Sequence, residues 1–259
     1  MENPCEPSSL RQASACACNN RLKRNTRSAC CAWTTCRCSS ATCARSDAAG
    51  VDEIVLALGF QSDKVVQELA RLGRTAEIVL NERYDLGSVL TVHTVADAMT
   101  RGGDVLLMDA DVLYDERILH ALVADPDRPV DRVLIDRDFE AGDEPVKLCV
   151  KNGVPVELRK QLAVGLDYDT IGESVGFFRF TESTARRLAT IVAGYVDSGR
   201  ANMPHEEAVR DLLLEGGRTF DIADVTGAPW IEIDFPTDVA RAAQDVLPLI
   251  QRTTAGAAR

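Results

Sequence analysis

The chain has 259 residues, of which 46% are apolar, and its 40 acidic and 29 basic side chains give a net charge of −11. This length predicts one large domain, and the acidic balance argues against a nucleic-acid binder, because such affinity comes mainly from Lys and Arg that neutralise phosphates. The sequence has no apolar run of transmembrane length and no apolar core of a signal peptide, so we expect a cytoplasmic protein without membrane contact.

Two unlike segments meet near residue 47. Residues 1–46 contain eight of the nine cysteines and no Val, Ile, Phe or Tyr, whereas residues 47–259 carry a regular apolar pattern. The first segment cannot build an ordinary core, and we predict it to be disordered. Its cysteine spacing does not match the ligand pairs of structural zinc and it contains no His, while no secretion signal supports disulfides.

From residue 51 onward the predicted elements alternate between strands and helices. Strands are expected at 53–58, 76–80, 105–108, 133–135, 146–151, 154–158, 175–180, 219–223 and 230–234, and helices around 65–72, 88–101, 183–196, 205–215 and 236–249. Asn152-Gly153 predicts a two-residue type I′ hairpin between two of these strands. The pattern predicts an α/β fold with a mostly parallel sheet that a β-hairpin insertion interrupts.

Two of the expected strands end in acidic residues. The apolar stretch Leu106–Met108 is followed directly by Asp109-Ala110-Asp111. In the stretch that begins at Trp230, the apolar Ile231 and Ile233 alternate with Glu232 and Asp234. Ligands of open α/β sheets bind beyond the carboxyl ends of strands, and residues two apart in an extended chain point the same way. If the two strand ends are neighbours, Asp111 and Asp234 form an oxygen site for Mg²⁺ bound to a nucleotide. Each motif alone is equally compatible with a turn or a helix cap.

Several motifs, in order, resemble the nucleotidyltransferase family. They are Asn81-x-x-Tyr84, Gly87-Ser88, residues 108–113, residues 172–178 and residues 230–238. The similarity is to the branch of sugar-phosphate nucleotidyltransferases and phosphocholine cytidylyltransferases, and it covers about residues 47–250. It implies a three-layer α/β/α sandwich with the GT-A-like fold of nucleotide-diphospho-sugar transferases. It also implies that Asp111 and Asp234 hold Mg²⁺, and that Gly87 and Ser88 lie against the nucleotide base.

The N-terminal segment departs from this family. The family begins with a strand and a glycine-rich loop, L-A-A-G-x-G-x-R-L, followed by P-K-x-L, whose backbone amides and cations bind the triphosphate. Residues 1–46 show neither motif, so we expect the domain 47–259 to lack its first strand and phosphate loop. Read in a shifted frame, the codons of residues 9–18 permit the loop motif and those of residues 26–28 permit P-K. We therefore interpret residues 1–46 as a frameshifted segment.

Other candidate residues each have a plain structural interpretation beside the functional one. Lys147 and Lys160 flank the hairpin and could reach phosphate groups, or could be solvated edge-strand lysines. Glu173 could act on the acceptor or cap a turn, and Asp109 would share the nucleotide site with Gly87 and Ser88. The acids that follow His205 are explained by a helix start, where the helix dipole favours negative charge.

The leading hypothesis is a Mg²⁺-dependent nucleotidyltransferase in which a small phosphate or phosphonate acceptor attacks the α-phosphorus of CTP, with Lys147 and Glu173 as catalytic residues. Choline as a head group is disfavoured, because it needs aromatic faces and only 5% of the residues are aromatic. One alternative is a GT-A-like glycosyltransferase with a nucleotide-sugar donor. A haloacid-dehalogenase-type phosphatase fits less well, because its nucleophile strand normally opens the domain. The non-enzyme alternative is a damaged product that exposes an unpaired central strand edge.

Overall fold

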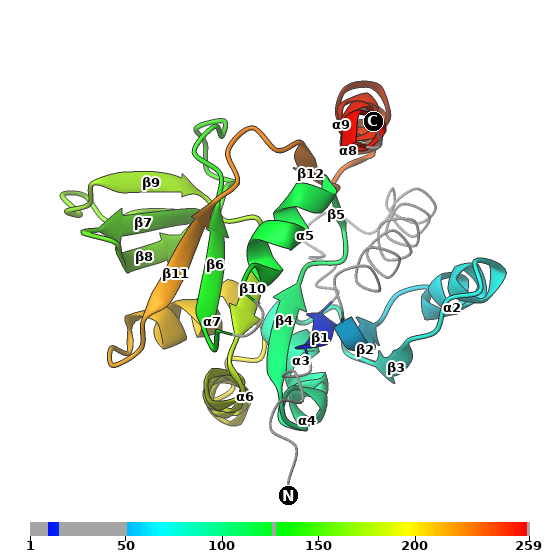
Figure 1. Cartoon of the computed structure of the whole chain (residues 1–259). Coiled ribbons are helices and arrows are strands. Elements are labelled where there is room, and N and C mark those ends of the chain that lie inside the picture. The colour runs from blue at the N-terminus through cyan, green and yellow to red at the C-terminus, as the bar shows by residue number, and fades with distance from the viewer. Residues whose placement is uncertain (1–9, 16–50, 126–127, 258–259) are drawn as a thin grey trace, which may run out of the picture.

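The computed structural model describes residues 10–15, 51–125 and 128–257 (Figure 1). The strands are β1 (Leu10–Ala15), β2 (Val51–Leu58), β3 (Glu77–Leu80), β4 (Asp104–Met108), β5 (Val112–Tyr114), β6 (Asp131–Ile135), β7 (Lys147–Lys151), β8 (Val154–Arg159), β9 (Thr170–Glu173), β10 (Phe177–Phe180), β11 (Phe220–Asp224) and β12 (Trp230–Glu232). The helices are α2 (Ser62–Arg71), α3 (Ser88–Thr94), α4 (Ala96–Met99), α5 (Glu116–Val123), α6 (Glu182–Asp197), α7 (His205–Leu214), α8 (Pro236–Arg241), the π-helical η1 (Ala242–Val246) and α9 (Leu247–Ala257).

A seven-stranded sheet with the order β11-β6-β10-β4-β1-β2-β3 forms the centre of the molecule. All its neighbouring strands are parallel except β10, which runs antiparallel to both β4 and β6. Two smaller sheets, β12-β5 and β8-β7-β9, adjoin it. The predicted α/β class with a mostly parallel sheet is therefore confirmed.

The expectation that the first strand is missing is wrong. Leu10–Ala15 forms β1, which pairs in parallel with β2 on one side and β4 on the other, so these two strands have no open edge between them. The same stretch lies within the residues where the shifted frame permits the family motif. The expected phosphate loop and the other residues of 1–46 lie outside the described residues, and the frameshift stays a prediction.

Alternating apolar side chains divide the strands between two helical layers. Val55 and Ala57 belong to the cluster that α3, α6 and α7 cover, whereas Leu56 and Leu58 pack against α2 on the opposite face. Helix α5 covers that second face beside β4, where it contacts Met108 and its neighbours. The result is the expected three-layer α/β/α sandwich, because a strand that is buried on both faces needs helices on each side.

The hairpin between β7 and β8 has the predicted turn. Asn152 and Gly153 both have positive φ, 51° and 76°, as a type I′ turn requires. The structure adds β9 to this hairpin, and it also adds β5 and α5, which were not predicted. Figure 1 shows the β7–β9 sheet at one side of the molecule. A bridge between Asp136 and Glu173 joins this sheet to the end of β6. Among the described residues, no helix is long and apolar enough to cross a bilayer.

Candidate active site

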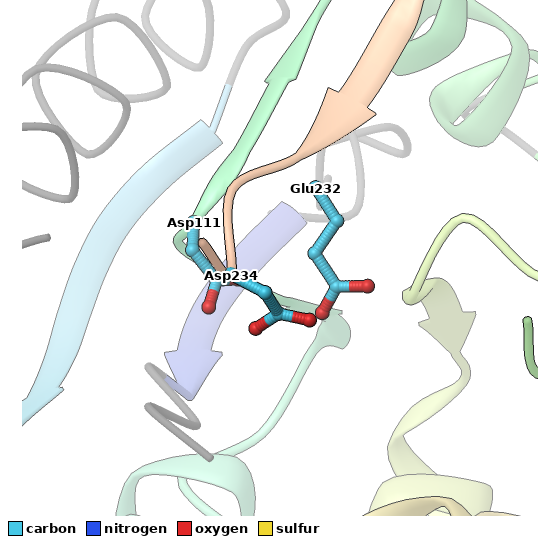
Figure 2. Close-up of side chains that lie close together, drawn as sticks. All are labelled: Asp111, Glu232 and Asp234. Atoms are coloured by element: carbon cyan, nitrogen blue, oxygen red, sulfur yellow. The ribbon is translucent and has the colours of Figure 1, made fainter. Parts of the chain in front are cut away.

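Three carboxylates converge at the carboxyl end of β4. Asp111, Glu232 and Asp234 each offer an oxygen atom, and these atoms all lie within 4.8 Å of one another (Figure 2). Three carboxylate oxygens form a donor set that suits a hard cation such as Mg²⁺. The structure thus brings together Asp111 and Asp234, as expected from the sequence. It adds Glu232, which the alternation of Glu232 and Asp234 along the strand could have indicated.

Backbone pairing places these three side chains. Strand β12 runs antiparallel to β5, with Glu232 opposite Val112, and the Ile233 N–H donates to the carbonyl of Asp111 over 3.1 Å. The Trp230 indole N–H donates to Asp136 Oδ2 at 2.7 Å, which fixes the start of β12 to the end of β6. The chain segment that carries Glu232 is therefore held from both sides.

A helix cap fixes the chain just after Asp234. Asp238 Oδ2 accepts hydrogen bonds from the backbone N–H groups of Asp234 and Phe235, at 3.2 and 2.8 Å. Pro236 is the first residue of α8, where its missing N–H costs nothing. The D-F-P-T-D sequence therefore begins helix α8 directly after Asp234 and fixes the backbone beside the carboxylate cluster.

Negative charge is concentrated around the cluster. Burial, with the charges of Asp111 and Glu206 next in importance, raises the pKa of Asp109 well above its usual value. The Glu232 side chain is exposed at the cluster. Reduced hydration of its carboxyl and the nearby Asp234 nevertheless raise the pKa of Glu232 to about 8, although Lys160 opposes the shift. A divalent cation would relieve this repulsion, so the residues present fit a metal ion.

Asp109 lies against a glycine that cannot be replaced without collision. Gly176 has φ +75°, and a Cβ built on it would lie 2.2 Å from Asp109 Oδ2. The Asp109 N–H donates to the Gly176 carbonyl at 3.3 Å. Gly176 therefore allows the start of β10 to lie so close to the end of β4 that it fixes the position of the Asp109 carboxyl group.

Gly87 and Ser88 pack against the loop before α7. A Cβ on Gly87 would lie 2.6 Å from the backbone carbon of Asn202, and Ser88 Oγ accepts the backbone N–H of His205 at 2.8 Å. Ser88 is buried, with 7% of its surface exposed. These contacts give the Gly-Ser pair a packing role, and its expected contact with a nucleotide base stays a prediction.

The two lysines of the β7–β9 sheet have different surroundings. Lys147, which pairs with Glu173 across the sheet, donates from Nζ to the carbonyls of Gly142, Pro145 and Lys160 at 2.7, 3.3 and 2.6 Å. An ammonium has three N–H donors, so these contacts occupy all of them. The Lys147 ammonium is thus committed to backbone carbonyls, which differs from the catalytic role expected from the sequence.

Lys160 lies close enough to the acidic cluster for its charge to oppose the rise in the pKa of Glu232. Lys147 and Lys160 both oppose the rise in the pKa of Glu173, and Lys160 Nζ has an exposed ion pair with Glu144 at 3.1 Å. Burial and the charge of Asp136 nevertheless raise the pKa of Glu173 to about 7. Near the cluster, Glu173 thus offers a carboxyl group of raised pKa, and Lys160 offers a cation on a flexible side chain.

Comparison with known proteins supports this picture. No family model matches the chain. The CMP-5'-(3-aminopropyl)phosphonate synthase of Streptomyces rubellomurinus is 25% identical over 201 residues, which are 74% of this chain and 31% of that protein. The chain thus spans about a third of the length of this relative.

Solved structures share the fold over almost the whole chain. The inositol-1-phosphate CTP transferase from T. maritima has a TM-score of 0.70 at 17% identity and covers 95% of this chain and 97% of its own. The CTP:phosphocholine cytidylyltransferase from Streptococcus pneumoniae has a TM-score of 0.62 at 14% identity, with coverages of 90% and 97%. The resemblance to nucleotidyltransferases and the fold that it implied are therefore confirmed.

Proposed function

We propose that the chain catalyses Mg²⁺-dependent transfer of CMP from CTP to a small phosphate or phosphonate acceptor, with release of pyrophosphate. The observation that carries this proposal is the convergence of Asp111, Glu232 and Asp234 at the carboxyl end of β4, in a fold that CTP transferases share. Nucleotidyl transfer needs charge neutralisation on the phosphates, and a carboxylate site for a divalent cation supplies it.

The metal would be held by Asp111 and Asp234, with Glu232 beside them. When bound, Mg²⁺ supplies positive charge to the phosphates at which negative charge develops. The chain itself fixes the carboxylates before any ligand arrives, because β12, the Trp230 anchor and the Asp238 cap hold their backbone. Such preorganisation reduces the reorganisation that the reaction requires.

Lys160 would orient the acceptor phosphate in this proposal. It is the lysine whose charge acts on both Glu173 and Glu232, whereas the Lys147 ammonium is occupied by carbonyl groups. Gly87 and Ser88 would lie on the nucleotide side, beside Asp109. Lys160 therefore replaces Lys147 as the proposed acceptor-binding cation, and Lys147 shapes the end of the hairpin that carries it.

The charge of the site favours an acceptor that carries an amine. Glu206 adds negative charge beside Asp111 and Asp234, and the triphosphate of CTP adds more, so one divalent ion does not offset all of it. An ammonium group on the acceptor would relieve the remainder, since opposite charges within a few ångströms attract. The relative from Streptomyces is named for an aminopropylphosphonate. We therefore propose an aminoalkyl phosphonate or phosphate as the acceptor class.

The test is incubation of the full chain with Mg²⁺, radiolabelled CTP and each of several acceptors. In parallel, a variant in which residues 9–46 are read in the shifted frame is treated in the same way. We expect pyrophosphate and a labelled CMP conjugate, with 3-aminopropylphosphonate used in preference to propylphosphonate. A UDP-sugar that yields free nucleoside diphosphate would instead support a glycosyltransferase. Failure of both proteins with every acceptor and NTP would contradict the proposal.

A further inference from the structure

A buried histidine joins the two sides of the candidate site. His205 is the first residue of α7 and only 2% of its surface is exposed. Its Nδ1 lies 3.2 Å from Ser88 Oγ at the start of α3, and its Nε2 lies 3.8 Å from Asp109 Oδ1 at the end of β4. The imidazole ring therefore spans the space between the Gly87–Ser88 turn and the carboxylate cluster.

Two buried polar atoms face each other at the end of this ring. His205 Nε2 and Asp109 Oδ1 are both inaccessible to solvent, and neither has a hydrogen-bond partner in the part of the chain that the structure describes. A buried donor and acceptor without a bond are costly, whereas an apolar side chain of similar size could fill the same space without that cost. The pair is best explained by a hydrogen bond that is open in this state and forms in another.

The contact between Ser88 and Nδ1 favours a hydrogen on Nε2. Ser88 Oγ already accepts the backbone N–H of His205 at 2.8 Å, so its own hydrogen can be donated to Nδ1. The neutral tautomer that accepts from Ser88 carries its hydrogen on Nε2, which then points to Asp109. Glu206 Oε2, 3.2 Å from Nδ1, favours the opposite tautomer, so the inference requires that Ser88 is the donor at Nδ1.

Asp109 is constrained on its other side as well. Its Oδ2 packs against Gly176, where a Cβ would lie only 2.2 Å away. A carboxyl group held between a glycine and a histidine donor has one orientation. A donor at Oδ1 would satisfy a buried oxygen that otherwise has no partner in the described residues, which removes the cost of leaving it unpaired.

We infer that His205 is a positioning residue, which couples the Gly87–Ser88 turn to Asp109 through an Nε2–H···Oδ1 hydrogen bond that closes when nucleotide binds. The inference rests on the proposed function for its kinetic consequence but not for its geometry. Catalytic hydrogen bonds are often long in the free protein and shorten in the complex. Nucleotide contact at Ser88 would thus fix the orientation of the Asp109 carboxyl group, which lies beside Asp111.

Kinetics of two His205 variants test the coupling. His205→Leu fills the space without a donor and should lower kcat/KM for CTP by about 10-fold or more, the loss expected when a buried oxygen is left without a partner. His205→Gln, which keeps a side-chain donor, should recover most of it. In a double-mutant cycle, the loss in Ser88→Ala with His205→Leu should be smaller than the sum of the two single losses, because both interrupt one chain of contacts. Equal activity of His205→Leu and the wild type, or of the Leu and Gln variants, would overturn the inference.

Tyr195→Phe is the matched control for loosening of α7. It removes the 2.8 Å hydrogen bond that Tyr195 Oη on α6 donates to Asp211 Oδ2 on α7. This variant should lose stability without a change in KM for CTP. If it reproduced the kinetic loss of His205→Leu, the effect of His205 would be structural only.

Nitrogen NMR separates this inference from the proposed function. The chain has three histidines, so ¹⁵N-labelled His205 can be assigned from the spectrum of His205→Gln. We expect a hydrogen on Nε2 in the free protein and a shift of that signal with saturating CTP and Mg²⁺. An unprotonated Nε2, or a signal that does not respond to bound nucleotide, would overturn the inference. Absence of turnover in both the wild type and the variant with the restored frame, together with a protonated Nε2, would contradict the proposed function alone.

Discussion

Replacement of Gly176 by Ala should disable the site more than it unfolds the protein. The new Cβ would lie 2.2 Å from Asp109 Oδ2, so the carboxylate must move by roughly 1 Å to reach ordinary van der Waals contact. Misplacement of a catalytic-site group by this distance can cost about 100-fold in rate. Because Gly176 has φ +75°, an L side chain there also costs about 1–2 kcal/mol of stability.

Gly199→Ala is the control that separates these two effects. Gly199 has φ +76°, close to that of Gly176, but a Cβ there would meet no atom within 4 Å. Both variants should lose free energy of unfolding because of the positive φ, measured by denaturant titration, and Gly176→Ala should lose more because of the collision with Asp109. Only Gly176→Ala should lose pyrophosphate release. Equal turnover in the two variants would show that the position of the Asp109 carboxylate does not matter for the reaction.

Three further predictions address the lysines, Glu173 and the N-terminal segment. Lys160→Met should raise the KM for the acceptor by about 10-fold, because a charged contact is lost. Lys147→Met should chiefly lower stability. The reverse pattern would refute the assignment of Lys160 as the acceptor-binding cation. Because the pKa of Glu173 is raised to about 7 in the folded protein, its ionisation destabilises the fold as pH rises from its unfolded value through 7. Glu173→Gln should therefore become more stable than the wild type across that range, and a pH-independent difference would count against the raised pKa. Isothermal titration with CTP and Mg²⁺ should give a dissociation constant in about the millimolar range for the chain as written. Restoring the frame of residues 9–46 should tighten the binding. Micromolar binding by the written chain would contradict the frameshift interpretation.

The sequence predicted those elements whose signal is local. Apolar runs such as 105–108 are typical of strands buried on both faces, and Asn152-Gly153 determines its own turn. Strand β1 was not predicted, because Leu10–Ala15 has little apolar pattern and is placed by its pairing with β2 and β4. Its position is a property of the assembled sheet, which no local pattern reports.

The candidate site divides in the same way. Asp111 and Asp234 could be predicted to meet, because both follow apolar strands at which alternation sets the direction of the side chain. The environment of His205 could not be predicted, since a polar residue at a helix start has an ordinary explanation. Only the fold shows that Ser88 and Asp109 lie on either side of its ring. The commitment of Lys147 to three carbonyls likewise depends on where the hairpin ends meet.

Asp111 and Asp234 are proposed as the metal site of a nucleotidyltransferase. This is tested by Mg²⁺-dependent pyrophosphate release by Asp111→Asn and Asp234→Asn, made in the variant with the frame of residues 9–46 restored, with Asp167→Asn as an exposed control that pairs with Lys151. We predict that each site variant loses about 100-fold or more of turnover, while its stability stays within roughly 1 kcal/mol of the wild type and the control stays active. Wild-type turnover and Mg²⁺ dependence in either Asp111→Asn or Asp234→Asn would exclude that residue from the metal site.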